Sequence, residues 1–293
     1  MELRQLRYFV KAKELLNFTE AANVLSISQS TLSQQIAQLE QELGIPLFNR
    51  VGKRITLTEA GDLFYGYAQE SLNRANSGIA MLKELNGLTT GKLLIGVTYG
   101  LRDLMTPVLL EFLDQYPSIK VEVLFGTSQQ LRGMLLDQQL DILLTFEEIV
   151  HDNSLMYTLL FESPLCLVSS KSVVLNKNEI TLTEVMKLPL VLPAKGYSTR
   201  QFIDDTLVKS RQQPNISVEI NDIPTLLDLV RTGKWYTMLA RTTVGLAEDL
   251  ICTPIKGKNM GRKAMLLSVK DIYVKKAVTA FCEQLLANAK KII

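Results

Sequence analysis

The sequence predicts an α/β fold behind an all-α N-terminal domain. Up to about Leu88, apolar residues recur three or four positions apart, which is the spacing of helices. From Lys92 onward, short apolar runs alternate with amphipathic stretches, which is typical of strands connected by helices. A chain of 293 residues, 47% hydrophobic and 21% charged, allows two or three domains with apolar cores.

The chain opens with a helical stripe that we expect to pack on the two helices after it. Its apolar residues are Leu3, Leu6, Phe9 and Val10. Residues 17–50 then read as two helices joined by a tight turn. For the first, from about Thr19 to Leu25, Thr19 is the expected cap. After a break at Ser26–Ser28, the second helix runs to about Leu43 and stops at Gly44.

The second of these helices has one apolar and one polar face. Leu32, Ile36, Leu39 and Leu43 share a face at ~100° per residue. The polar face carries hydroxyl and amide groups that can bond base edges and phosphates, and a helix-turn-helix places such a face in the major groove. A solvated face on an ordinary helical hairpin is the alternative. The residues predicted to bind DNA are Thr19, Ser28, Gln29, Ser30, Thr31, Ser33 and Gln34.

Three cations follow this helix pair and form a predicted wing. Arg50, Lys53 and Arg54 surround a short turn, and Ile55–Thr58 reads as a strand, so the cations can reach the phosphate backbone. Bulk charge adds little, because the net charge is +2 and the cations and anions of the first 65 residues cancel. The DNA prediction therefore depends on the motif and on where the charges lie.

In this region the chain resembles the LysR-type transcriptional regulators. The matching motifs are LRYFV, FTEAANVL, SQSTLSQQIAQLEQELGIPLFNR and ITLTEAG, in order and at the N-terminal end. Two positions depart from the pattern: many members have Pro in place of Ser30, and Arg or Lys in place of Gln34. The second departure removes a cation from the DNA-facing side, so we expect phosphate affinity to depend more on the wing.

A long helix is predicted from Glu59 to about Leu88, with a hinge at Gly87–Gly91. Its apolar residues repeat as a heptad seam, and thirty residues would span ~45 Å, so the stripe needs a partner helix. The resemblance implies an antiparallel pairing with the same helix of a second copy, in a dimer that usually assembles further into a tetramer. The predicted dimerisation residues are Ala68, Leu72, Ala75, Ile79 and Leu82.

The remainder reads as two α/β lobes. Strands at Lys92–Val97, Lys120–Phe125 and Leu140–Thr145 alternate with helices, which predicts a parallel sheet with right-handed crossovers. Pro164–Ser170 crosses into a second lobe, and Lys263–Val269 returns to the first. The helices expected in the lobes are Leu104–Tyr116, Ser128–Gln138, Thr199–Arg211, Ile223–Thr232 and Asp271–Lys290, and the further strands are Leu190–Leu192, Ile216–Ile220 and Tyr236–Ala240.

The resemblance covers this part too and implies a two-lobed effector domain similar to periplasmic binding proteins. The segment GKWY from Gly233 to Tyr236 departs from the Gly-rich turn that relatives often have. The expected boundaries are 1–58 for the winged helix-turn-helix, 59–90 for the linker helix and hinge, 91–162 with 266–293 for the first lobe, and 163–265 for the second.

Three strand ends lead into helix starts that should face a cleft between the lobes. Helix N-termini offer free N–H donors and favour anions, and Arg102, Lys195 or Arg200 could add a cation. Capping of their own helices is the alternative for each residue. We predict a small anionic effector, most simply a carboxylate, which relatives often bind. The predicted contacts are Thr98, Tyr99, Gly100, Thr127, Ser128, Gly196, Tyr197, Ser198 and Thr199.

The sequence contains no recognisable catalytic apparatus. The single histidine, His151, lies in a polar loop, and the spacings of Cys166, Cys252 and Cys282 favour neither a disulfide framework nor a metal site. We expect no cofactor and no metal. An α/β enzyme and a solute-binding protein without a DNA role are the alternatives, but the latter lacks an export signal and leaves the first 90 residues unexplained.

The N-terminus lacks the apolar core of a signal peptide, and no apolar run is long enough to cross a membrane. We therefore expect a cytoplasmic, bacterial-type regulator with no membrane partner. Its expected partners are double-stranded operator DNA, further copies of itself and a small effector, and RNA polymerase is a candidate.

Overall fold

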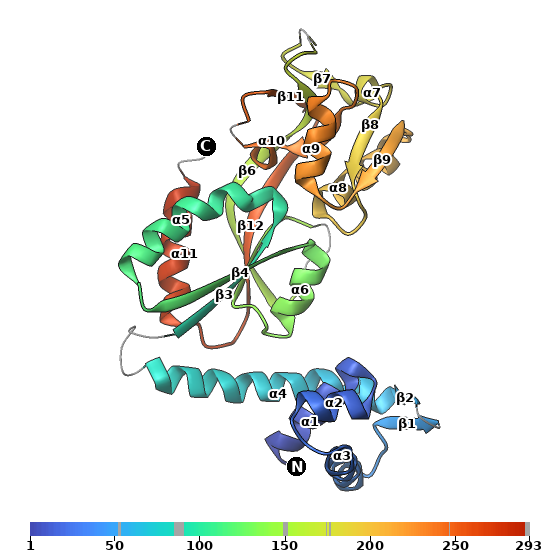
Figure 1. Cartoon of the computed structure of the whole chain (residues 1–293), viewed down its shortest axis with the longest axis vertical. Helices are drawn as coiled ribbons and strands as arrows, with labels where there is room; N and C mark the ends of the chain where they lie inside the picture. The colour runs from blue at the N-terminus through green and yellow to red at the C-terminus, as the bar shows by residue number, and fades with distance from the viewer. Residues whose placement is uncertain are drawn as a thin grey trace. The chain divides into compact units, whose positions relative to one another are not determined.

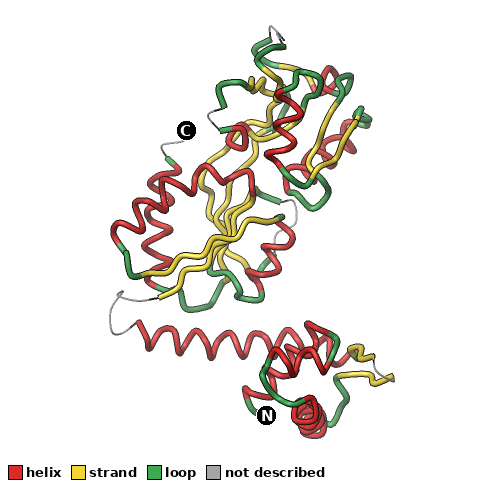
Figure 2. Tube along the Cα trace, in the orientation of Figure 1, coloured by secondary structure: helices red, strands yellow, loops and turns green. Residues whose placement is uncertain are grey.

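The computed structural model describes residues 1–51, 54–84, 91–148, 152–173, 175, 177–245 and 247–290. The chain folds as two compact units, Met1–Asn86 and Gly87–Ile293, which are described separately (Figures 1 and 2). Lys53 of the wing, the hinge before Gly91, and His151 lie outside the described residues.

The N-terminal unit is a helical bundle with a β-hairpin. Its apolar core includes Phe9, Leu32, Ile36 and Leu39, each completely buried, which confirms the predicted inner face of the third helix. Leu3 is 49% exposed, so the stripe on the first helix starts one turn later than predicted. The elements are α1 (Leu3–Leu15), α2 (Phe18–Val24), α3 (Gln29–Leu43), β1 (Phe48–Val51), β2 (Arg54–Leu57) and α4 (Glu59–Glu84), with β1 and β2 antiparallel.

The start of α2 differs from the prediction. Asn17, not Thr19, is the N-cap: its Oδ1 accepts hydrogen bonds from the backbone N–H of Thr19 at 3.0 Å and of Glu20 at 3.2 Å. Thr19 is the second helical residue, so its own N–H is one of the groups being capped. The ends of α3 agree with the prediction, because Ser28 caps it and Gly44 ends it in the left-handed region at φ 71°.

The long helix α4 corrects the expectation of one continuous intermolecular seam. Ala68 and Leu72 are buried in the core of their own unit, where α4 packs against α1. Their stripe is thus covered within the chain. Ile79 and Leu82, farther along, are 53% and 63% exposed.

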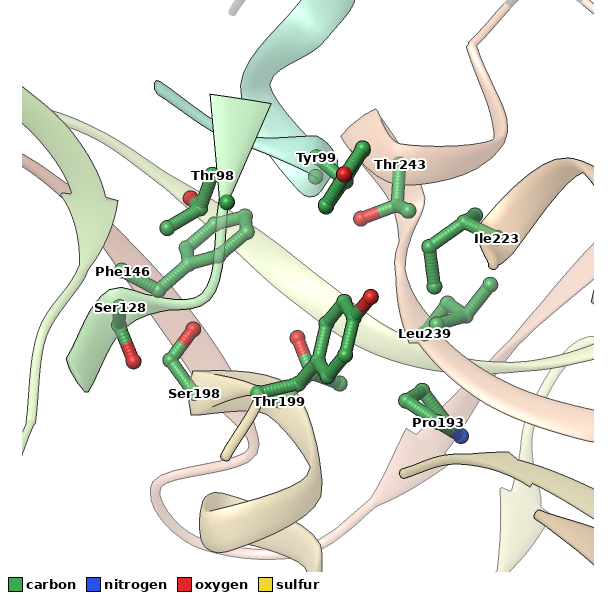
Figure 3. A pocket seen from close by; sticks show the side chains of 13 residues that line it. Thr98, Tyr99, Ser128, Phe146, Pro193, Ser198, Thr199, Ile223, Leu239 and Thr243 are labelled. Atoms are coloured by element: carbon green, nitrogen blue, oxygen red, sulfur yellow. The ribbon is translucent and has the colours of Figure 1, made fainter. Parts of the chain in front are cut away.

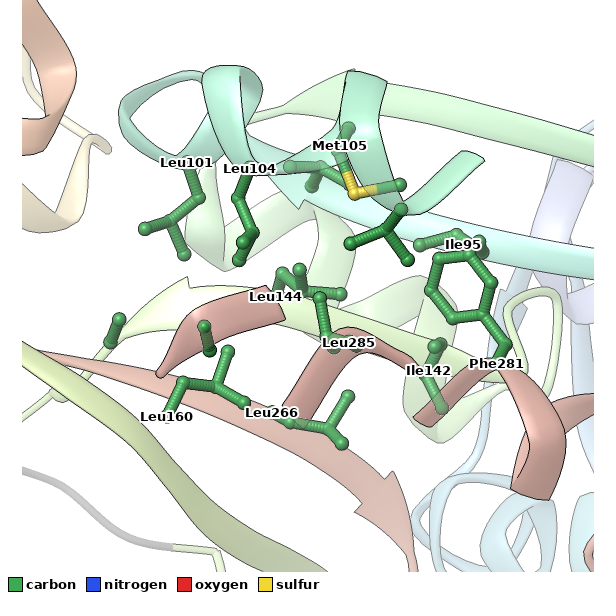
Figure 4. Close-up of a cluster of buried hydrophobic side chains, with 14 of the residues drawn as sticks. Ile95, Leu101, Leu104, Met105, Ile142, Leu144, Leu160, Leu266, Phe281 and Leu285 are labelled. Carbon is green, nitrogen blue, oxygen red and sulfur yellow. The ribbon is translucent and has the colours of Figure 1, made fainter. Parts of the chain in front are cut away.

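The first lobe of the C-terminal unit contains the predicted parallel sheet. Strand β3 (Gly91–Thr98) lies between β4 (Ile119–Gly126) and β5 (Ile142–Phe146), parallel to both. Helices α5 and α11 cover one face and α6 the other (Figure 1). Figure 4 shows the core between the sheet and the α5/α11 layer, where Ile95, Leu144 and Phe281 meet. The elements on this lobe's faces are η1 (Tyr99–Leu101), α5 (Arg102–Gln115), α6 (Ser128–Leu136) and α11 (Lys276–Ala289).

Two long antiparallel strands join the lobes. Strand β6 (Leu155–Ser170) starts well before the predicted strand. Its first part was not recognised in the sequence, because Glu162 and Pro164 interrupt the apolar pattern. Its first part pairs with β12 (Gly261–Val269), and its second part pairs with β11 (Leu250–Lys256) and β10 (Thr237–Ala240). Strand β12 already pairs with β6 from Gly261, five residues before the expected boundary at 266.

The second lobe packs around a smaller parallel pair of strands. Strands β8 and β9 were predicted, as were α8 and α9, whereas β7, α7, α10 and β11 were not. No helix of the described residues is long and apolar enough to span a membrane. The remaining elements are β7 (Ile180–Thr181), α7 (Leu182–Val185), β8 (Leu190–Pro193), α8 (Ser198–Ser210), β9 (Ile216–Ile220), α9 (Ile223–Arg231) and α10 (Arg241–Val244).

One carboxylate on α3 ties this helix to the wing, and this contact generates a stability prediction. Glu40 Oε1 accepts hydrogen bonds from the buried backbone N–H groups of Leu47 at 2.8 Å and Phe48 at 3.0 Å. Replacing Glu40 with Ala should lower the local unfolding free energy of α3 by about 2–4 kcal/mol, because two buried donors lose a charged acceptor. Hydrogen exchange of the α3 amides measures this quantity.

Glu42 provides the matched control on the same helix. Its carboxylate is exposed and bonds only the N-terminal ammonium among the described groups, so Glu42→Ala should cost less than ~1 kcal/mol. Equal losses in the two variants would contradict the assigned role of Glu40.

Candidate functional site

The exposed face of α3 carries a row of polar side chains. Ser28, Gln29, Ser30, Thr31 and Gln34 are exposed. Ser28 Oγ lies 2.8 Å from the hydroxyls of both Ser30 and Thr31, and Gln29 donates to the hydroxyl of the partly buried Ser33 at 3.2 Å. Gln34 has no hydrogen-bond partner within the described part of the chain. The row can therefore exchange weak local hydrogen bonds for bonds to another molecule.

The other predicted DNA contacts lie on separate elements. Thr19 is exposed on α2. Arg50 and Arg54 occupy the two strands of the hairpin, with Arg50 paired to Ile55 and Arg54 to Val51. The backbone thus places both arginines beside the turn of the predicted wing.

A pocket lies between the two lobes of the C-terminal unit (Figure 3). The space between its lining side chains is about 340 Å³, a volume that includes the open mouth. Seven of the nine predicted contacts line it: Thr98, Tyr99, Gly100, Ser128, Tyr197, Ser198 and Thr199.

The two predicted contacts that do not line the pocket have structural roles. Thr127 caps α6 by accepting a hydrogen bond from the backbone N–H of Gln130 at 3.3 Å, as the capping alternative proposed. Gly196 adopts φ +95° in the turn before α8, a conformation that residues with side chains rarely adopt.

Sequence reasoning missed five lining residues; a sixth, Gly126, belongs to one of the three strand ends that were predicted to face the cleft. Phe146 stands at the end of β5, so the rule used for the other strand ends could have identified it. Thr243 belongs to α10, which was not predicted, and the apolar members look like ordinary core residues. The five are Phe146, Pro193, Ile223, Leu239 and Thr243.

The polar groups of the pocket are hydroxyls, and most have no partner. Thr98 Oγ1 donates to the carbonyl of Leu144 at 3.3 Å. Ser128, Ser198 and Thr199 are buried, and their hydroxyls have no hydrogen-bond partner among the described residues. Thr243 Oγ1 is also buried without a partner there. A bound molecule with polar atoms could satisfy these groups.

No charged side chain lines this pocket, so the three predicted cations do not contact a ligand there. Arg200 is buried and fully engaged: it pairs with Asp204 at 2.8 Å and Glu219 at 2.7 Å. Arg102 and Lys195 are exposed, and the guanidinium of Arg102 lies 3.6 Å from the carboxylate of its neighbour Asp103. The expectation of a lining cation was therefore wrong.

Three aromatic rings form a stack beside the pocket. Tyr99 stacks on Phe125 at a centroid distance of 5.9 Å and on Tyr197 at 5.9 Å. The Tyr197 hydroxyl donates to the carbonyl of Asn221, and burial raises the pKa of this phenol. Because Tyr99 belongs to the first lobe and Tyr197 to the second, the stack connects the lobes.

Two cysteines that are distant in sequence lie on neighbouring strands. In the pairing of β6 with β11, Cys166 faces Pro254 and Cys252 faces Val168, which makes the cysteines diagonal neighbours. Both are free thiols, and the hydrogen bond between them together with burial raises the pKa of Cys166. Among the described residues, no group of three His, Cys, Asp or Glu side chains could hold a metal ion.

Comparisons with known proteins agree with these two regions. Residues 3–62 match the model of the bacterial regulatory helix-turn-helix protein, lysR family, and residues 86–290 match the LysR substrate binding domain. The chain is 31% identical over 247 residues to the HTH-type transcriptional regulator YwqM of Bacillus subtilis, covering 83% of this chain and 84% of the relative. It is 30% identical over 256 residues to the regulator CysB of Haemophilus influenzae, covering 86% of this chain and 79% of that protein.

Solved structures share the fold over nearly the whole chain. A full-length OxyR variant from Pseudomonas aeruginosa superposes with a TM-score of 0.71 at 20% identity, covering 99% of this chain and 95% of that one. Full-length CbnR complexed with its target DNA gives a TM-score of 0.62 at 21% identity, with 98% and 100% covered.

The wall of the pocket depends on the absence of a side chain at Gly100. A Cβ there would lie 2.8 Å from both Phe146 Cε2 and Thr243 Oγ1. Replacing Gly100 with Ala should therefore overpack the wall and cost about 1–3 kcal/mol of unfolding free energy. Urea unfolding, followed through the fluorescence of Trp235, measures the change.

Gly133 on α6 is the matched control, because a Cβ there would meet no atom within 4 Å. Gly133→Ala should stabilise the helix by about 0.5–1 kcal/mol. A Gly100→Ala variant as stable as the parent would show that the pocket wall can move aside.

Proposed function

The chain belongs to the LysR family of DNA-binding transcriptional regulators, and we propose that α3 reads operator bases while a small effector in the interlobe pocket controls the protein. The observation that carries the first part is the division of α3 into a completely buried apolar face and an exposed polar row. Family membership explains the first 90 residues, which a solute-binding protein without a DNA role does not.

The proposed DNA contacts fall into two classes. Gln29, Ser30, Ser33 and Gln34 lie in the first turns of α3, the part of a helix-turn-helix that enters the major groove. Thr19, Ser28, Thr31 and the wing cations Arg50, Lys53 and Arg54 are proposed contacts at the helix ends and the phosphate backbone. The wing supplies affinity for any sequence, and α3 supplies the base preference.

The proposed dimer contact uses the exposed part of α4. Ala75, Ile79 and Leu82 continue the heptad stripe beyond the part that the N-terminal core covers. Exposed apolar stripes of this kind favour a partner helix. We extend the proposal to a tetramer acting in the cytoplasm with RNA polymerase as a partner, on family grounds alone.

The proposed effector is a small anion, most simply a carboxylate. The helices α6 and α8 begin at the pocket wall with Ser128 and Ser198, so their N-termini favour negative charge. The hydroxyls without partners add donors for its oxygen atoms. The pocket is proposed to bind this molecule, not to transform it, and the protein is proposed to be a regulator without enzymatic activity.

The base-reading role of Gln34 can be tested by selecting binding sites from random DNA. Gln34→Ala should remove the preference for one base, adenine, at one position of each half-site. A bidentate contact between glutamine and adenine contributes about 1–3 kcal/mol of discrimination. Gln41 is exposed on nearly the same side of α3 but two turns later. Gln41→Ala should leave the selected sequence unchanged, and identical selections for both variants would contradict the role of Gln34.

The dimer contact can be tested with a charge on the exposed stripe of α4. Ile79→Asp should dissociate the dimer, because the carboxylate would be buried at the helix pair. Static light scattering reports the mass. Ser77, on the opposite side of the helix at ~100° per residue, is the control, and Ser77→Asp should remain dimeric. A dimer that survives Ile79→Asp would mean that the contact lies elsewhere.

A further inference from the structure

A buried cation lies directly behind the wall of the interlobe pocket. Arg262 on β12 is only 3% exposed. Its guanidinium carbon lies 5.1 Å from the ring centroid of Phe146, which lines the pocket, and 4.5 Å from that of Phe202. Phe202 lies on α8 four residues after Ser198, so it shares a helix face with a pocket hydroxyl. The cation is therefore enclosed between rings of both lobes.

The guanidinium of Arg262 has few partners for a buried charge. Nη1 donates to the carbonyl of Glu147 at 3.4 Å, while Nε and Nη2 are buried without any partner among the described residues. Burial lowers the pKa of Arg262 to about 10, so the group stays protonated at neutral pH. A protonated, poorly paired guanidinium in this position needs a physical reason.

The two carboxylates near Arg262 each form an ion pair with another cation. Glu148 pairs with Arg132 at 2.6 Å, and Glu147 pairs with Lys263 at 3.2 Å. Both carboxylates also attract the guanidinium of Arg262. Three cations and two carboxylates nevertheless leave one net positive charge behind the neutral ring of Phe146. In a poorly hydrated interior, such a charge acts over the width of a ring.

We propose that Arg262 sets the charge preference of the pocket: acting through the ring of Phe146, its guanidinium selects for an anionic effector. Arg262 is a positioning residue in this arrangement, because the ring separates it from the ligand. The hydroxyls of the lining then orient the anion, and the buried guanidinium makes its negative charge favourable. This inference rests on the proposed effector role of the pocket.

A thiol placed in the pocket can measure this field without any ligand. In a Ser128→Cys protein, the pH dependence of alkylation by iodoacetamide at position 128 gives the pKa of that thiol. Peptide mass spectrometry separates it from the native thiols Cys166, Cys252 and Cys282. The same measurement is made after adding Arg262→Met, Arg262→Gln or Arg262→Lys.

Loss of the charge should raise the pKa of the introduced thiol by about one unit in the Met and Gln variants. Because the thiolate is the reactive form, alkylation at pH 7 should then be about tenfold slower. Arg262→Lys should restore the parental value, since it keeps the charge. Arg102→Met is the control: it removes an exposed cation at the start of α5, and it should leave the pKa unchanged.

An unchanged thiol pKa in a folded Arg262→Met or Arg262→Gln protein would overturn the proposal, as would an equal rise in the control. Circular dichroism verifies folding, and the Gln side chain keeps a donor for the Glu147 carbonyl if the Met variant fails to fold. Because the measurement needs neither DNA nor effector, its failure leaves the effector proposal standing. That proposal fails separately if no small anion alters operator binding.

Discussion

The pairing of β6 with β12 is the interaction on which the C-terminal unit depends. Strand β6 is shared by both lobes, and β12 pairs with it from Gly261 onward. At the crossover, Ser163 is opposite Arg262, and its hydroxyl accepts a hydrogen bond from the backbone N–H of Thr242 at 3.2 Å. This bond positions α10, which brings Thr243 to the pocket. The crossover therefore fixes a wall of the interlobe pocket as well as the connection between the lobes.

The N-terminal unit also depends on one contact between distant segments, in this case the close approach of the start of α4 to the segment before the wing. The hydroxyl of Thr58 donates to the carbonyl of Pro46 at 2.8 Å and accepts from the N–H of Gly61 at 3.0 Å. A Cβ at Gly61 would lie 2.2 Å from the carbonyl oxygen of Leu47, so only glycine allows α4 to start this close to the wing. The motif ITLTEAG thus has a physical explanation: it joins α3, the wing and α4 into one body.

The sequence predicted best those features that depend on neighbours in the chain. The apolar face of α3, the break before it at Ser26–Ser28 and its stop at Gly44 are local, and all three were predicted. Features that depend on distant contacts were missed. Leu155–Pro164 forms a strand because it pairs with β12, and Ala68 is buried because α4 packs against α1. Neither partner can be recognised from the neighbouring sequence.

The prediction of the pocket's polar and charged groups was limited in the same way. Strand ends and helix starts identified all of its hydroxyls except that of Thr243. The predicted cations were Arg102, Lys195 and Arg200, because these residues lie near those helix starts in sequence. Two of them are exposed, where water and salt screen a charge, and the third is engaged by carboxylates.

A cation that does lie against the pocket wall is Arg262, 5.1 Å from the ring centroid of Phe146. It comes late in the sequence, on the strand that follows the second lobe. Its poor pairing breaks the usual rule for buried charges, and such exceptions occur where function offsets their cost. Enclosure by Phe146 and Phe202 keeps water away from the guanidinium without neutralising it. A pocket lined by neutral groups can thus still favour an anion, because the hydroxyls orient the ligand and the buried guanidinium makes a negative charge on it favourable.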